Sequence, residues 1–196
     1  MDPTPVAPSG GSDARILFFG QIRRYKGVEG LVAAFERIEG EHQLRIAGQV
    51  REEGLRQILE DAASRDRRIE LDLRFLPEED LLEHLRWSSI VVLPFTRSFS
   101  SGSLLFALSA GRGVVLPDIS YLRDYLDDEV TITYLPDDED GLIRALTEAV
   151  RWDHVAMGVA ALRHAERFDW TRGSSVVADA YRGSPERRSL FRRTGR

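Results

Sequence analysis

The chain of 196 residues has room for one well-packed domain, and its 42% hydrophobic and 30% charged residues are typical of a globular protein. The net charge of −5 gives no electrostatic reason to expect a nucleic-acid partner, and the absence of cysteine excludes disulfides and thiolate metal sites. No apolar run approaches the roughly 20 residues that span a bilayer, and the first residues lack a signal-peptide pattern. We therefore expect a cytoplasmic protein.

The two ends of the chain differ in composition from its middle. Residues 1–14 are rich in Pro, Gly and Ser, which predicts a disordered tail or an interdomain linker. Residues 183–196 carry five arginines and few apolar side chains, which predicts a second disordered tail. We expect one folded domain over residues 15–182.

Strands and helices are expected to alternate through that domain. Apolar runs predict strands at 15–19, 42–47, 69–75, 89–93, 113–116 and 130–134. Helical spacing predicts helices at 28–38, 52–64, 78–87, 104–110, 139–151, 154–167 and 171–181, with a helical turn at 121–126. Near-continuous apolar strands between helices indicate an α/β fold, a doubly wound Rossmann-like parallel sheet of about six strands flanked by helices.

A serine-rich loop, 96–103, follows the fourth expected strand and precedes an apolar helix. Ser100, Ser101 and Ser103 offer hydroxyl groups, and Gly102 lets a ligand approach the backbone without meeting a Cβ. A helix start also exposes unpaired N–H groups, so the loop is a candidate phosphate site. The alternative is a plain serine cap on the helix.

A basic loop, 20–27, follows the first expected strand. It places Arg23, Arg24 and Lys26 within four positions, and such cations can bind a diphosphate. The alternative is a solvated basic turn. The chain has neither a P-loop nor the Rossmann glycine fingerprint after this strand, which argues against ATPases and dinucleotide dehydrogenases.

Four stretches together resemble a known family. They are Phe-Phe-Gly-Gln-Ile-Arg-Arg-Tyr-Lys-Gly at 18–27, Leu-Arg-Ile-Ala-Gly at 44–48, Leu-Arg-Phe-Leu-Pro at 73–77 with Ser-Ser-Ile-Val-Val-Leu-Pro at 88–94, and Ser-Gly-Ser-Leu-Leu-Phe-Ala-Leu-Ser-Ala-Gly at 101–111. In this order they are similar to the C-terminal, donor-binding domain of retaining GT-B glycosyltransferases, in the glycosyl transferases group 1 (family 4-like) clan. The Ser-Gly-x-Leu-Leu stretch resembles one branch of that family.

The resemblance implies a role for individual residues. It makes Lys26 the catalytic cation that neutralises the departing diphosphate, and it places the diphosphate and the nucleotide on two groups of residues. The diphosphate group is Arg23, Arg24, Lys26, Ser101, Gly102 and Ser103, and the base and ribose group is Arg74, Phe75, Leu76 and Leu104. Gln21 stands where the family has an arginine, and Ser98 and Phe106 stand where it often has two glutamates.

The resemblance implies transfer of a sugar from an NDP-sugar with retention of configuration, in polysaccharide biosynthesis. The acceptor-binding N-terminal domain would be a partner that this chain lacks, so the isolated domain is expected to be inactive. No metal and no cofactor beyond the NDP-sugar is expected. One alternative is a non-catalytic nucleotide-sugar-binding module for assembly or regulation, because Phe106 cannot accept a hydrogen bond from ribose.

Two further alternatives carry less support. A receiver-like signalling domain would need an acidic cluster after its first strand, where this chain has Phe19 and Gly20. The basic tail 183–196 could make a peripheral contact with anionic lipid at the inner face of the membrane, although a solvated tail explains the same composition. The four histidines and the acidic runs at 127–129 and 137–140 are expected to serve packing, caps and solvation rather than metal binding.

Overall fold

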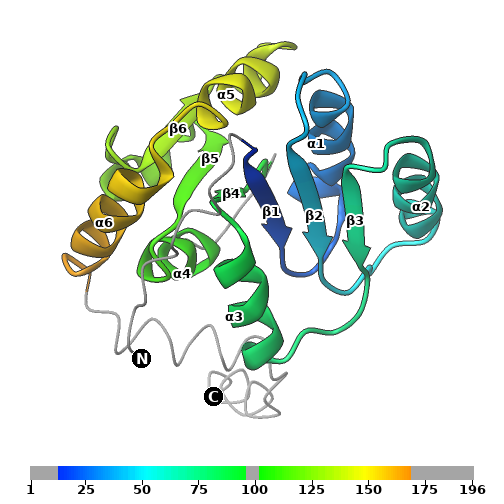
Figure 1. Cartoon of the computed structure of the whole chain (residues 1–196), viewed down its shortest axis with the longest axis horizontal. Helices are drawn as coiled ribbons and strands as arrows, with labels where there is room; N and C mark the ends of the chain where they lie inside the picture. Colours follow the sequence, from blue (N-terminus) through cyan, green and yellow to red (C-terminus); the bar gives the residue numbers. More distant parts are fainter. Residues whose placement is uncertain (1–12, 96–101, 169–196) are drawn as a thin grey trace, which may run out of the picture.

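A computed structural model describes residues 13–95 and 102–168 of the chain. Its centre is a six-stranded sheet in the order β3-β2-β1-β4-β5-β6, with every neighbouring pair parallel (Figure 1). The strands are β1 (Arg15–Phe19), β2 (Gln43–Ala47), β3 (Ile69–Asp72), β4 (Ile90–Val92), β5 (Gly113–Pro117) and β6 (Thr131–Tyr134). The doubly wound parallel sheet predicted from the sequence is confirmed.

Helices cover both faces of this sheet. They are α1 (Val28–Phe35), α2 (Leu55–Arg65), α3 (Glu78–Trp87), α4 (Gly102–Ser109), α5 (Gly141–Ala149) and α6 (His154–Ala165), with 3-10 turns η1 (Arg24–Lys26) and η2 (Ser120–Tyr125). The apolar helices α1 and α4 and the amphipathic α2, α3, α5 and α6 each bury a stripe against the strands. Two apolar layers therefore enclose the sheet.

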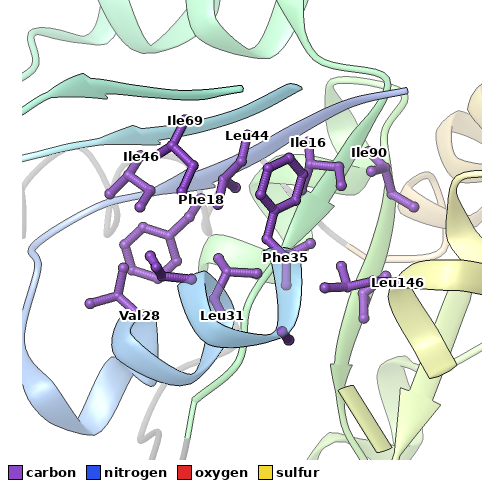
Figure 2. Packing of buried hydrophobic residues seen from close by; sticks show 14 of the residues in the cluster. Ile16, Phe18, Val28, Leu31, Phe35, Leu44, Ile46, Ile69, Ile90 and Leu146 are labelled. Carbon is purple, nitrogen blue, oxygen red and sulfur yellow. The ribbon is translucent and has the colours of Figure 1, made fainter. Parts of the chain in front are cut away.

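The alternation of side chains along β1 shows how the two layers are divided. Ile16 and Phe18 belong to the cluster formed with α1, α2 and α5, whereas Leu17 and Phe19 belong to the cluster formed with α3, α4 and α6. Figure 2 shows the first layer, in which Phe35 of α1 lies against the strand residues. Because both faces are buried, these strands are almost entirely apolar, as the sequence pattern indicated.

Several element boundaries differ from the expected ones. The strand expected over 69–75 ends at Asp72, where the chain turns towards α3, and the helix expected over 28–38 ends at Phe35. The helix expected from residue 52 begins at Leu55, and the short helix η1 was not expected. Ala14, placed in the tail from the sequence, is buried, and its N–H donates to His42 Nδ1. The expected helix at 171–181 lies outside the described residues.

The order of the strands identifies the edge at which a ligand can bind. From β1 the chain moves outward to β2 and β3, and it then crosses through α3 to β4 on the other side of β1. The connections after β1 and β4 consequently depart to opposite faces of the sheet. In open α/β sheets this switch point leaves a crevice beyond the carboxyl ends of the strands.

Candidate functional site

Two glycines let the loops after β1 and β2 run side by side at the carboxyl edge of the sheet. Gly20 has φ of 116° and Gly48 has φ of 144°, values that favour glycine. A Cβ on Gly48 would lie 1.8 Å from the carbonyl oxygen of Gly20. Beyond them, Ile22 and Val50 form an isolated parallel bridge. The two loops therefore begin as one continuous platform above β1 and β2.

The basic loop after β1 packs directly on the chain that leaves β4. Gly27 has φ of 71°, and a Cβ added to it would lie 2.0 Å from the carbonyl oxygen of Pro94. The Nζ of Lys26 lies 3.9 Å from the centre of the Phe95 ring and 5.6 Å from that of Tyr25. The basic loop thus packs at the β1/β4 switch point on Pro94 and Phe95, which precede the serine loop in the chain.

Lys26 has an unusual electrostatic environment for a surface loop. Burial lowers the pKa of its ammonium from 10.5 to about 8. Within the part of the chain that the structure describes, no carboxylate forms an ion pair with it. It is also the only lysine in a chain whose other cationic residues are all arginines. The site therefore holds one compact, poorly solvated cation that is available to an anion.

The two arginines of the basic loop differ in their ion pairs. The guanidinium of Arg24 lies 2.7 Å from a Glu29 carboxylate oxygen and 3.7 Å from a Glu52 oxygen. Arg23, just before η1, has no ion pair among the described residues. The structure therefore leaves Arg23 available to a ligand beside Lys26, while two carboxylates already balance the charge of Arg24.

The serine loop is described only from its last residues. Gly102 and Ser103 form the first turn of α4, and Ser98, Ser100 and Ser101 lie outside the described residues. Leu104, predicted to contact the nucleotide, is 2% exposed and belongs to the core layer of α3, α4 and α6. The structure thus places Leu104 beneath the site, among the packing residues.

Phe106 is part of the same core layer. It is 8% exposed, and its ring stands edge-on to Phe19 with 6.2 Å between the ring centres. Edge-to-face packing is favourable for aromatic pairs. The position at which the family often has a ribose-binding glutamate is therefore occupied by an apolar side chain that stabilises the sheet.

The three residues predicted to hold the base lie in the loop after β3, but they face different surroundings. Arg74 forms ion pairs with Asp72, at 2.9 Å, and with Asp80. Phe75 is 49% exposed, and Leu76 is buried. Phe75 and Leu76 both line a hollow at the carboxyl ends of β1 to β3, and Arg74 does not line it.

The hollow includes residues that the sequence reasoning did not select. Gln21, Gln49 and Arg51 line it together with Gly20, Gly48 and Leu81. Gln49 and Arg51 directly follow Gly48 at the end of β2, at the same edge of the sheet as the basic loop. Their position after a strand was the signal that could have found them.

The histidines mostly hold the fold together. His84 Nε2 lies 3.0 Å from Asp72 Oδ2 and so links α3 to the end of β3. His154 and His164 contact the backbone carbonyls of Ala149 and Tyr125 at 3.0 and 2.9 Å. Among the described residues, no group of three His, Asp or Glu side chains is arranged to hold a metal ion.

Residues 13–151 match the family described as glycosyl transferases group 1, which is more than half of the chain. The chain belongs to this family. The structure accordingly has the Rossmann-like fold of a GT-B glycosyltransferase domain, and the membership in this family inferred from the four sequence stretches is confirmed. The C-terminal position of the domain stays a prediction.

A curated relative of this glycosyltransferase domain is similar in sequence over part of its length. A GDP-mannose:glycolipid 4-beta-D-mannosyltransferase of Xanthomonas campestris pv. campestris is 38% identical over 104 residues, which cover 53% of this chain and 30% of the relative. The chain thus spans under a third of the curated relative that it matches.

Solved structures are similar at lower identity. A sucrose-phosphate synthase from Thermosynechococcus elongatus has a TM-score of 0.68 at 21% identity, covering 88% of this chain and 46% of its own. HepE from Anabaena, in complex with UDP, has a TM-score of 0.69 at 15% identity, covering 88% of this chain and 50% of its own. These likenesses show the fold of the domain.

No helix within residues 13–95 and 102–168 is long and apolar enough to cross a membrane.

Proposed function

We propose that this domain binds the donor of a sugar-transfer reaction and holds the diphosphate of an NDP-sugar over the β1/β4 switch point. The observation that carries the proposal is the environment of Lys26. This single lysine packs on Phe95 beside the end of β4, with no carboxylate partner among the described residues. A half-buried ammonium that no carboxylate of the described residues balances is stabilised when a ligand anion approaches it.

The site can stabilise the charge that develops as the sugar leaves its diphosphate. The ammonium of Lys26 is a fixed cation in a poorly hydrated environment, where its attraction to a developing negative charge is stronger than in water. Arg23 adds a second cation, and Gly102 and Ser103 present the unpaired N–H groups at the start of α4. In this proposal Ser101 also contacts the diphosphate, and Arg24, whose charge Glu29 and Glu52 already balance, contributes less than Lys26 and Arg23. We expect these groups to act without a metal ion.

The donor class is proposed from the relatives. The Xanthomonas mannosyltransferase uses GDP-mannose by its name, and HepE was solved with UDP. GDP-mannose is the donor that we propose, because the mannosyltransferase is 38% identical where HepE is 15%. An N-terminal acceptor-binding domain would complete the active site, so the isolated domain should bind donor without transferring sugar.

Titration calorimetry with GDP and GDP-mannose tests the diphosphate role. Lys26→Ala should weaken GDP binding by at least tenfold, because it removes one charge-assisted contact, while Lys26→Arg should keep part of the affinity. Arg67→Ala is the matched control, since it removes an exposed cation that precedes β3 at the opposite edge of the sheet. Equal GDP affinity in the wild type and in Lys26→Ala would refute the diphosphate role.

Retention of configuration remains a prediction from the family resemblance. The Xanthomonas relative makes a beta linkage by its name, which from the α-linked mannose of GDP-mannose is inversion, so the name of this relative opposes the prediction. An NMR spectrum of the product, obtained with the acceptor-binding domain joined to this chain, gives the anomeric configuration. An α-linked product from an α-linked donor would support retention, and a β-linked product would contradict it.

A second candidate function is a non-catalytic module that binds nucleotide sugars. Phe106 favours it, because the position of the ribose-binding glutamate is apolar and buried against Phe19. Donor turnover by the joined domains would exclude this candidate. Donor binding without turnover would support it.

Contact with a membrane surface is proposed from the name of the mannosyltransferase, whose acceptor is a glycolipid. The arginines of 183–196 lie outside the described residues and would supply the charge. Co-sedimentation with vesicles that contain anionic lipid, compared with a chain ending at residue 182, tests this contact. Equal sedimentation of the two chains would contradict it.

A further inference from the structure

The hollow at the carboxyl ends of β1 to β3 has the apolar surfaces of a nucleobase site. Leu76 and Leu81 are buried at its base. Phe75 lines the same hollow and keeps 49% of its surface exposed, so part of its ring can contact a ligand. An exposed aromatic ring beside an apolar floor is a surface on which a flat base can stack.

The polar side of the hollow is set by the bridge between the loops after β1 and β2. Ile22 N–H donates to the Gln49 carbonyl at 2.9 Å, and Arg51 N–H donates to the Ile22 carbonyl at 3.0 Å. Successive side chains of extended backbone point to opposite sides, and Ile22 points into the core layer of α1, α2 and α5. Gln21, Gln49 and Arg51 therefore face the hollow.

Arg51 is distinguished from the neighbouring arginines by its lack of a partner. Arg56 pairs with Glu60, and Arg74 pairs with Asp72 and Asp80. Within residues 13–95 and 102–168, the guanidinium of Arg51 has neither an ion pair nor a hydrogen bond. All five of its N–H donors are therefore available to a ligand.

We propose that Arg51 recognises guanine and so makes the site selective for a GDP-sugar. This inference deepens the proposed function and rests on it. Guanine presents two adjacent acceptors, O6 and N7, which match the two parallel donors of a guanidinium. Adenine presents an amino donor beside N7, which opposes an arginine donor, and uracil presents a single carbonyl oxygen at that edge.

The position of the hollow agrees with this assignment. The diphosphate loops follow β1 and β4, and the hollow extends from the end of β1 across the ends of β2 and β3, away from β4. A nucleotide whose diphosphate is at Lys26 can therefore extend outward along the sheet edge and place its base on Phe75. The base then meets Arg51 at the end of β2.

Calorimetry with GDP, UDP and 7-deaza-GDP tests the inference. The wild-type domain should bind GDP about tenfold to a hundredfold more tightly than UDP, and Arg51→Ala should remove most of that preference. Because 7-deaza-GDP lacks the N7 acceptor, it should bind the wild type about tenfold more weakly than GDP and should bind Arg51→Ala as GDP does. Arg163→Ala, which removes an exposed arginine of α6, is the matched control.

The outcomes separate this inference from the diphosphate role. If Arg51→Ala weakens GDP and UDP by the same factor, Arg51 binds phosphate and the guanine inference is overturned. If Lys26→Ala leaves affinity unchanged while Arg51→Ala removes the preference for GDP, guanine recognition stands and the diphosphate role fails. Absence of binding of every nucleotide to the wild type overturns both. An unchanged melting temperature of Arg51→Ala, whose side chain is exposed, shows that the variant folds.

Discussion

Binding of a diphosphate should raise the pKa of Lys26, and the magnitude can be estimated from the structure. In the unliganded domain, burial lowers this pKa from 10.5 to about 8, which corresponds to about 3 kcal/mol against the charged form. A ligand charge about 4 Å away, at an effective dielectric constant of about 20, restores roughly 4 kcal/mol. The pKa in the GDP complex should therefore return to its ordinary value of 10.5 or rise slightly above it.

The pH dependence of GDP affinity follows from the pKa values of Lys26 in the free and in the bound domain. Below pH 8 the ammonium is charged in both the free and the bound domain, so GDP affinity should not depend on this group. Between pH 8 and the raised value, binding requires uptake of a proton, and the affinity should fall about tenfold per pH unit.

The composition of the chain makes this measurement direct. Because Lys26 is the only lysine, incorporation of ¹³C-lysine labels one Cε, whose chemical shift reports its ionisation. The titration is recorded with and without saturating GDP, and Lys26→Ala identifies the resonance. A pKa near 10.5 in the free domain would refute the burial argument, and a pKa that GDP leaves unchanged would refute the contact with the diphosphate.

Two further predictions concern stability. Lys26→Met should raise the free energy of unfolding at pH 7 by about 1–2 kcal/mol, because the cost of burying the charge exceeds the cation–π attraction to Phe95. Since the pKa of Lys26 is lower in the folded than in the unfolded state, this cost is present below pH 8 and is relieved as the pH rises towards 10.5. Urea titrations should therefore show a smaller difference in stability between Lys26→Met and the wild type at pH 10 than at pH 7. An equal difference at the two pH values would contradict the burial of the charged ammonium. Gly48→Ala should lower the free energy of unfolding by about 3 kcal/mol or more, because its Cβ would lie 1.8 Å from the Gly20 carbonyl oxygen. Gly30→Ala, in α1 with open space around the new Cβ, should instead stabilise by about 0.5–1 kcal/mol, and similar losses in the two variants would disprove the steric argument.

The sequence by itself determined the fold class and the place of the basic loop after the first strand. Apolar strands buried on both faces differ in periodicity from amphipathic helices, and this local property identified six strands in the correct order along the chain. Lys26 could be placed after the first strand for the same reason. Its predicted contact with a ligand followed from the rule that ligands bind beyond the carboxyl ends of such strands.

Only the tertiary structure decided which charged side chains remain available to a ligand. Arg24 and Arg51 look alike in the sequence, but Glu52 approaches Arg24 from a loop 28 residues away, while Arg51 is left without a partner among the described residues. The hollow beside Arg51 exists because the order of the strands brings Phe75 next to it. Availability depends on which carboxylates the fold brings within reach, whether near in the chain, as Glu29 is to Arg24, or distant, as Glu52 is, and the sequence alone does not show which pairs form.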